Sequence, residues 1–311
     1  MPLKTWVIGA GGLIGSAIVR HREVGSFAAG QIPWDTPDAA GILGAELDRF
    51  ITWVGDDNWS IVWAAGAGVM HTSQGELDAE LAVFEQFCQR LSRETPHGRG
   101  GFYFVSSAGG AYAGSVDPPF GVNTEPVPLN PYGGSKIAQE VIAESQLAGR
   151  VPVTIGRVAN AYGPGQNVAK RQGLVTELCL NALLNRPATI FAPLTTLRDY
   201  VYVDDIAAVI VPDLLRMATA DASAHQLRVI ASGRSVSIAE LLVLVERATG
   251  RYIGVRHTFT GDSHVLDLRL EGLDDPLFDG IGATPLDVGI SLVFQDLIAR
   301  LGAGTLGVGA G

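Results

Sequence analysis

Tyr132 and Lys136 are two residues whose side-chain types and spacing indicate acid–base chemistry. They are four positions apart at the expected start of a helix over 132–147, so their side chains share one helix face. A tyrosine phenol has an ordinary pKa of about 10 and is a poor base near neutral pH. A neighbouring ammonium group favours the phenolate and lowers that pKa. The pair can therefore act as a general base on a substrate hydroxyl, or it can be a surface Tyr and Lys without a role.

Two serines, Ser106 and Ser107, follow an apolar segment expected to be a strand over 102–105. Sites in open parallel sheets lie beyond the carboxyl ends of the strands. A serine there can hydrogen-bond a reacting oxygen, or it can bond only the local backbone. We expect Ser107, or Ser106, to act with Tyr132.

A glycine loop lies between an expected strand over 5–8 and an expected helix over 13–20. Its glycines have the spacing G-x-x-G-x-x-G, which lets a pyrophosphate approach the backbone at the start of a helix. A tight turn without a ligand is the alternative. The predicted cofactor-binding residues of this loop are Gly9, Gly12, Leu13, Ile14 and Gly15.

The identity of the dinucleotide depends on the residue that meets the adenosine ribose. Asp35 lies 20 residues after Gly15, the usual distance for a ribose-binding acid. Its neighbours Pro33 and Pro37 equally suggest a turn and a helix cap. Arg20 and Arg22 offer partners for a 2′-phosphate. We expect NAD as the cofactor and leave NADP open.

The segments that must position these residues alternate between strand-like and helix-like patterns. Such alternation implies parallel strands joined by crossover helices. The predicted fold class is α/β, a Rossmann-like doubly wound parallel sheet with a smaller C-terminal α/β substrate domain. Segment 21–59 is atypical, because it holds no clear second strand. We assign residues 1–166 and part of 199–232 to the dinucleotide-binding domain, 167–198 and 233–301 to the substrate domain, and 302–311 to a flexible tail.

Composition narrows the possible partners. The 311 residues carry 22 Lys and Arg against 32 Asp and Glu, a net charge of −10, which argues against a nucleic-acid-binding face. Apolar runs of about 18 residues are absent, so we expect no membrane span. Cys88 and Cys179 form no disulfide framework, which indicates a reduced, cytoplasmic compartment. The six His show no metal-ligand spacing, so we expect no metal.

Several longer strings resemble the extended short-chain dehydrogenase/reductase family, in particular its NAD-dependent nucleotide-sugar epimerases and dehydratases. The resemblance covers about residues 5–300. The strings that carry it are the glycine loop, the Ala64-Ala65-Gly66 strand end, Pro-Tyr-Gly-x-Ser-Lys at 131–136, R-x-x-N-x-Y-G-P-G-Q at 157–166 and R-D-[FY]-V-Y-V-D-D at 198–205.

The resemblance implies roles for further residues. Ala64, Ala65 and Gly66 would line the cofactor, and Lys136 with Tyr132 would contact its nicotinamide half. A substrate diphosphate would be bound by Asn160, Arg198 and Arg269, since arginine pairs well with phosphate oxygens. Members of the family tend to form dimers through helices equivalent to 76–92 and 132–147, so we expect a homodimer.

Two features depart from the family pattern. The family's Ser or Thr usually stands four residues before the tyrosine that is Tyr112 here, and that position is Ala108. The Thr-Asp-Glu string of the 4,6-dehydratases is also absent, which disfavours a dehydratase that uses those acids.

We therefore expect an NAD(P)-dependent enzyme that modifies a nucleoside diphosphate sugar, by epimerisation through a transient keto-sugar. A dehydratase or reductase of the same family shares the first step and is the nearest alternative. A non-catalytic NAD(P)-sensing protein is the alternative from another class, and the intact Tyr132 and Lys136 argue against it.

Overall fold

The computed structural model describes residues 2–66, 72–170, 172–258, 265–272 and 283–306. The chain divides into two compact units. Unit 1 comprises Met1–Gly114, Glu125–Arg157 and Ala207–Arg228, and unit 2 comprises Ser115–Thr124, Val158–Ile206 and Val229–Gly311.

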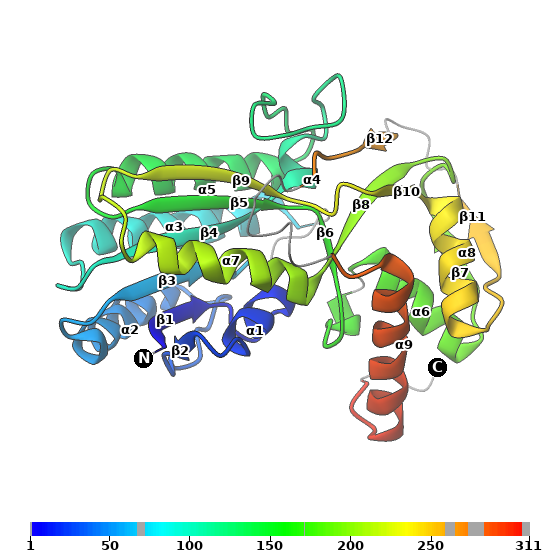
Figure 1. The fold of residues 1–311 in the computed structure, drawn as a ribbon, viewed down its shortest axis with the longest axis horizontal. Coiled ribbons are helices and arrows are strands. Elements are labelled where there is room, and N and C mark those ends of the chain that lie inside the picture. The colour runs from blue at the N-terminus through cyan, green and yellow to red at the C-terminus, as the bar shows by residue number, and fades with distance from the viewer. Residues whose placement is uncertain (1, 67–71, 171, 259–264, 273–282, 307–311) are drawn as a thin grey trace. The chain divides into compact units, whose positions relative to one another are not determined.

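A six-stranded sheet, in the order β2-β1-β3-β4-β5-β9, organises unit 1 (Figure 1). The pairs β1–β2, β1–β3 and β3–β4 are all parallel. The predicted doubly wound α/β fold class is thereby confirmed. The strands are β1 (Leu3–Ile8), β2 (Val24–Ser26), β3 (Trp59–Trp63), β4 (Gly100–Ser107), β5 (Val153–Val158) and β9 (His225–Ile230).

The strand order reverses between β1 and β3, because β2 lies on one side of β1 and β3 on the other. Ligands of such sheets bind beyond the carboxyl ends of the strands at this switch point. Only the three-residue β2 lies outside β1, and α2 (Ala39–Val54) then leads into β3. The expectation that segment 21–59 holds no clear second strand is therefore corrected: β2 lies there, but it is only three residues long.

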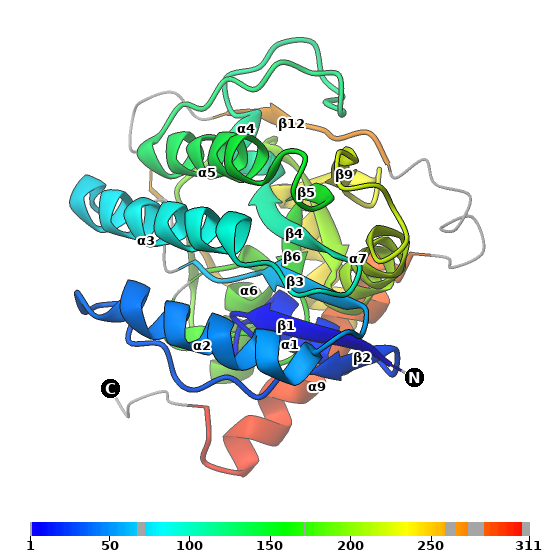
Figure 2. The same ribbon diagram turned by 90° about the vertical axis from the view of Figure 1, so that its left-hand side faces the viewer.

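Helices cover both faces of this sheet (Figure 2). On one face lie α2, α3 (Gln74–Arg93) and α5 (Pro131–Leu147), and on the other lie α1 (Leu13–Val19) and the part of α7 (Val203–Met217) that belongs to unit 1. The α3 helix begins at the capping box predicted by Ser73 and Glu76. The α5 helix begins at Asn130, whose Oδ1 accepts a hydrogen bond from Gly133 N at 2.8 Å.

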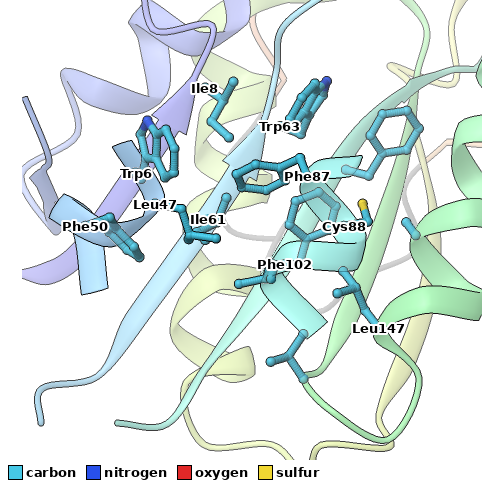
Figure 3. Close-up of a cluster of buried hydrophobic side chains, with 14 of the residues drawn as sticks. Trp6, Ile8, Leu47, Phe50, Ile61, Trp63, Phe87, Cys88, Phe102 and Leu147 are labelled. Carbon is cyan, nitrogen blue, oxygen red and sulfur yellow. The ribbon is translucent and has the colours of Figure 1, made fainter. Parts of the chain in front are cut away.

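The core between the sheet and the first set of helices is rich in aromatic rings (Figure 3). Trp63 on β3 packs edge-on against Phe84, with their ring centroids 4.8 Å apart. Phe84 also lies 5.1 Å from Phe104 on β4. The contacts among these fully buried rings hold α3 against the sheet, and α3 also carries Glu80.

Unit 2 is built from short sheets and three packed helices. Strand β8 pairs with β6, β10 and β12, and β7 pairs with β11. Residue 306 is a buried leucine of the unit 2 core, and residues 307–311 of the predicted tail lie outside the described residues. The elements are β6 (Asn160–Tyr162), α6 (Leu174–Leu184), β7 (Ala188–Ile190), β8 (Leu197–Tyr202), β10 (Ser235–Ser237), α8 (Ile238–Thr249), β11 (Val255–His257), β12 (Asp267–Leu268) and α9 (Leu286–Gly302), with a 3-10 turn at Val168–Lys170.

None of the helices in the described part of the chain is both long enough and apolar enough to cross a bilayer.

Replacing Phe84 with alanine tests the aromatic core. Because the ring is fully buried between Trp63 and Phe104, Phe84→Ala should lower the free energy of unfolding by about 3–5 kcal/mol. Phe84→Leu should cost less, since leucine refills much of the space. Urea unfolding followed by circular dichroism measures both. Equal stability of Phe84→Ala and the wild type would contradict this packing.

Candidate active site

The glycine loop after β1 is shaped by close backbone contacts. Gly9 has a φ of +95°, and a Cβ there would lie 2.6 Å from Ala65 N. A Cβ on Gly15 would lie 2.2 Å from Gly9 O. At Gly11, in contrast, a Cβ would meet no atom within 4 Å. Glycine is therefore needed at positions 9 and 15 to bring the loop, α1 and the end of β3 together.

The residues after β3 meet this loop directly. Ala64 N donates to Ile8 O at 2.9 Å, which aligns the ends of β1 and β3 at the switch point. A Cβ on Gly66 would lie 3.3 Å from both Lys136 Nζ and Glu80 Oε1. The structure therefore brings the predicted cofactor residues 64–66 together with the glycine loop on one side and with Lys136 on the other.

Asp35 lies elsewhere than the end of β2. It is exposed in a turn over 34–38, and Ser26 is the last residue of β2. The turn is anchored by Trp34, whose ring packs edge-on against Trp63 at 5.9 Å. The role of Asp35 toward an adenosine ribose stays a prediction.

Ser107 and Tyr132 are neighbours. A Cβ on Gly110 would lie 3.4 Å from both Ser107 Oγ and Tyr132 Cε1, and Ser107 Oγ accepts from Gly110 N at 3.1 Å at the start of α4 (Ala108–Ala111). A Cβ on Gly133 would lie 2.3 Å from Gly110 O. This close approach of the two backbones places Tyr132, the residue before Gly133, beside Ser107.

Ser106 points into a different cluster. Its Oγ donates to Glu140 Oε1 at 2.5 Å, and Arg157 donates to both oxygens of the same carboxylate, at 2.6 Å from Nη2 to Oε2. Arg157 Nη1 also donates to Tyr112 OH at 2.9 Å. Ser106 is therefore not beside Tyr132, because successive side chains of a strand point to opposite faces.

Lys136 is buried beside Tyr132. Its Nζ donates to Gln139 Oε1 at 2.9 Å, lies 3.7 Å from Glu80 Oε1, and sits 5.3 Å from the centre of the Phe104 ring. The centre of the Tyr132 ring is 5.9 Å away. The predicted common face of Tyr132 and Lys136 is thus what the structure shows.

The prediction about the acidity of Tyr132 is wrong for the protein alone. Burial raises the pKa of the Tyr132 phenol above its ordinary value, the hydrogen bond with Ser107 lowers it, and the negative charge of Glu80 raises it further. Burial also lowers the pKa of the Lys136 ammonium group, against the pull of Glu80 and Glu140. The sequence showed the spacing of the pair but not its desolvation.

The residues predicted to bind the substrate diphosphate lie in unit 2, whereas Ser107, also predicted to contact substrate, lies in unit 1. Asn160 Nδ2 donates to Asp199 O at 2.8 Å across the β6–β8 pair. Arg198 is on β8, where its Nη1 donates to Leu197 O, and burial lowers its guanidinium pKa. Arg269 follows β12, the neighbour of β8, and pairs with Asp267 at 2.9 Å. The two arginines therefore lie on adjacent segments, and the negative charge of Asp267 acts on both of them.

This geometry fits a dinucleotide in unit 1. The backbone at Gly9 and Gly15 leaves no room for side chains, the position at Gly11 is open, and the first amides of α1 have no acceptor within the helix. Tyr132, Ser107 and Lys136 supply two hydroxyls and an ammonium group near the same strand ends. Such a set can bind a hydroxyl group and move its proton.

Sequence reasoning missed Glu80, Gln139 and the Glu140–Arg157 pair. Gln139 and Glu140 stand three and four residues after Lys136, so helix spacing could have placed them near it. Glu80 is on another helix, and no local pattern connects it to Lys136.

Comparison with known proteins identifies the family. Residues 62–225, just over half of the chain, match the model of the NAD dependent epimerase/dehydratase family. The chain therefore belongs to this family, as the resemblance of its motifs indicated.

Curated relatives are similar over part of their length. The chain is 34% identical over 124 residues to dTDP-L-rhamnose 4-epimerase of Burkholderia thailandensis, covering 39% of this chain and 33% of that protein. It is 28% identical over 146 residues to dTDP-4-dehydro-6-deoxyglucose reductase of Escherichia coli, covering 45% and 43%. The chain thus spans less than half the length of these relatives.

Solved structures share the fold over nearly the whole chain. UDP-glucose 4-epimerase of Thermotoga maritima, solved with UDP-glucose, has a TM-score of 0.72 at 22% identity and covers 96% of this chain and 100% of that one. UDP-glucuronic acid 4-epimerase of Bacillus cereus, solved with UDP-glucuronic acid and NAD, has a TM-score of 0.73 at 19% identity, with 96% and 99% covered.

Neighbouring glycines of α5 provide a matched test of the contact that places Tyr132. Gly133→Ala should lower the free energy of unfolding by about 1–3 kcal/mol, because its Cβ would clash with Gly110 O. Gly134→Ala meets no atom within 4 Å and should be neutral or stabilise by up to about 1 kcal/mol. Urea unfolding of both variants is the measurement, and equal stabilities would refute the contact.

Proposed function

We propose that this protein is an NAD-dependent enzyme that epimerises a nucleoside diphosphate sugar through a transient keto-sugar. The observation that carries the proposal is the placement of Ser107 and Tyr132 side by side at Gly110, with the buried Lys136 5.9 Å from the centre of the Tyr132 ring. Membership of the NAD dependent epimerase/dehydratase family supports it. So do the nucleotide-sugar epimerases among its relatives and fold neighbours, including one solved with UDP-glucuronic acid and NAD.

In the proposed mechanism, Tyr132 removes the proton from a sugar hydroxyl. Ser107 donates a hydrogen bond to the same sugar oxygen and steadies its developing charge. The positive charge of Lys136, 5.9 Å from the centre of the Tyr132 ring, would favour the phenolate while the proton is being transferred. A dinucleotide held by the glycine loop, Lys136 and Tyr132 would supply reversible hydride transfer at the sugar carbon. Tyr132 returns the proton to the same oxygen when the keto group is reduced on its other face. We assign Ser106 to the buried cluster around Glu140 and give it no catalytic role.

The cofactor is proposed to bind along the switch point of the unit 1 sheet. Its pyrophosphate would lie at the glycine loop, whose backbone a side chain at position 9 or 15 would displace. Its nicotinamide half would meet Lys136 and Tyr132. Exposed Asp35 stays a candidate for the adenosine ribose, so the preference for NAD over NADP is part of the proposal. The residues proposed to bind it are Gly9, Gly12, Leu13, Ile14, Gly15, Asp35, Ala64, Ala65, Gly66, Tyr132 and Lys136.

For the substrate, Asn160, Arg198 and Arg269 are proposed to bind the diphosphate. The partly buried guanidinium of Arg198 supports this role, because burial disfavours its charge and an anionic ligand would compensate for it. Arg269 would exchange its present partner Asp267 for phosphate oxygens. We further propose a homodimer that contacts its copy through α3 and α5, and a cytoplasmic location in keeping with the two unpaired cysteines.

A dehydratase or a reductase is the second candidate. Both begin with the same proton removal or its reverse, and a reductase and several dehydratases are among the relatives. A panel of UDP-, GDP- and dTDP-sugars in deuterated water, followed by NMR and mass spectrometry, separates the outcomes. An inverted sugar supports the epimerase, a dehydrated sugar the dehydratase, and reduction of an added keto-sugar nucleotide with consumption of NADH the reductase. Binding without any conversion supports an NAD-sensing protein.

Tyr132→Phe tests the proposed base. It should lower turnover by at least about 100-fold, because the proton acceptor is lost while the ring still fills its place. NAD binding, measured by calorimetry, should remain. Tyr252→Phe removes the same oxygen from a side chain that is 82% exposed and should leave turnover unchanged. Wild-type turnover in Tyr132→Phe would disprove the assignment.

Gly15→Ala tests the cofactor loop. The new Cβ would press on Gly9 O and displace the loop, so NAD should bind at least about tenfold more weakly. Gly41→Ala on α2 is the control, because its Cβ meets no atom within 4 Å. Calorimetric titration with NAD measures the affinities. If Gly15→Ala binds NAD as tightly as the control does, the cofactor does not lie on this loop.

A further inference from the structure

Three polar side chains meet between α3 and α5, close to Gly66. They belong to Glu80, Lys136 and Gln139. Lys136 is 6% exposed and Gln139 is completely buried. Ammonium groups are rarely buried to this extent without a partner of opposite charge. The arrangement around Lys136 therefore requires an explanation beyond the pairing with Tyr132.

We propose that Glu80 is a positioning residue for Lys136, which holds its ammonium group in place and keeps it protonated. The negative charge of Glu80 also sets the pH range in which Tyr132 exchanges its proton. The effect on Lys136 stands on the contacts alone, whereas the consequence for Tyr132 rests on the proposed function.

The orientation of the Gln139 amide supports this inference. Its oxygen accepts from Lys136 Nζ at 2.9 Å, and its nitrogen donates to Glu80 Oε1 at 3.4 Å. Lys136 Nζ and Glu80 Oε1 are 3.7 Å apart, an ion pair longer than a hydrogen bond. The amide thus turns its negative end to the cation and its positive end to the anion, which joins the three groups in one network.

The surrounding charges leave Glu80 as the counter-charge. Among the described residues, the titratable groups that face Lys136 are Glu80 from α3 and Glu140 and Tyr132 from α5. Arg157 from β5 already pairs with both oxygens of Glu140. The side from β4 offers the Phe104 ring, and the chain after β3 offers the backbone of Gly66. The negative charge on Glu80 therefore balances the ammonium group.

Removing this charge acts on both groups in the same direction. Glu80 raises the Lys136 pKa against the lowering by burial, and it raises the Tyr132 pKa in addition to burial. In Glu80→Gln both pKa values should fall. Activity is lost at low pH, where Tyr132 holds its proton, and at high pH, where Lys136 loses its charge. Both limbs of the pH profile should therefore move to lower pH.

The first experiment measures Lys136 without any substrate. The chain has three lysines, Lys4, Lys136 and Lys170, so protein made with ¹³C-lysine gives three side-chain signals. Lys4→Arg and Lys170→Arg assign them. In Glu80→Gln the titration midpoint of Lys136 should fall by about one pH unit or more, the effect expected when an opposite charge within about 4–6 Å is lost.

Glu85→Gln is the matched control. It removes the same charge from the same helix, at a carboxylate that accepts a hydrogen bond from Gln89. Its Lys136 midpoint should stay at the wild-type value. An unchanged midpoint in Glu80→Gln, or an equal shift in the control, would overturn the inference. Should Glu80→Gln fail to fold, Glu80→Asp and Glu80→Asn give the same comparison, because they are equal in size and differ in charge.

The second experiment measures kcat/KM against pH with the sugar nucleotide that the wild type converts. Both limbs of the profile should move to lower pH in Glu80→Gln and stay near the wild type in Glu80→Asp. A shifted Lys136 midpoint with an unmoved profile would overturn the link to Tyr132. If the wild type converts no sugar nucleotide, the proposed function fails, and the lysine titration still decides the role of Glu80.

Discussion

The buried charge of Lys136 is the constraint on which the arrangement of unit 1 depends. An ammonium group removed from water must be surrounded by compensating groups, and these come from three directions. Gln139 comes from its own helix, Glu80 from α3, and the face of the Phe104 ring from β4. The aromatic contacts of Phe84 hold α3 in place, so packing in the core also positions Glu80 beside the lysine.

The carboxyl end of β4 separates two polar clusters within two residues. Ser106 joins Glu140, Arg157 and Tyr112, a set in which every partner is buried and matched. Ser107 joins Tyr132 on the other side. One cluster fixes β4, β5 and α5 to one another, and the other presents its hydroxyls where the strands end. This division explains why two adjacent serines are needed and why they are not equivalent.

Much of this arrangement could be predicted from the sequence, where it depends on local spacing. The glycine loop, the capping box of α3 and the common face of Tyr132 and Lys136 follow from residues close together in the chain. The choice between Ser106 and Ser107 could not be made, because it depends on the strand phase at the point where α4 begins. Glu80 could not be found, since only tertiary packing brings it to Lys136. Helix α2 was missed although Leu43, Leu47, Phe50 and Val54 recur with helical spacing, because a second strand was sought in that segment.

The contact between Gly110 and Gly133 has an evolutionary consequence. It sets the spacing of the Ser107 and Tyr132 hydroxyls through main-chain atoms, provided that position 133 carries no side chain. The two hydroxyls are therefore insulated from drift in their neighbourhood. Substitutions elsewhere that leave this backbone contact in place should therefore leave the two hydroxyls side by side.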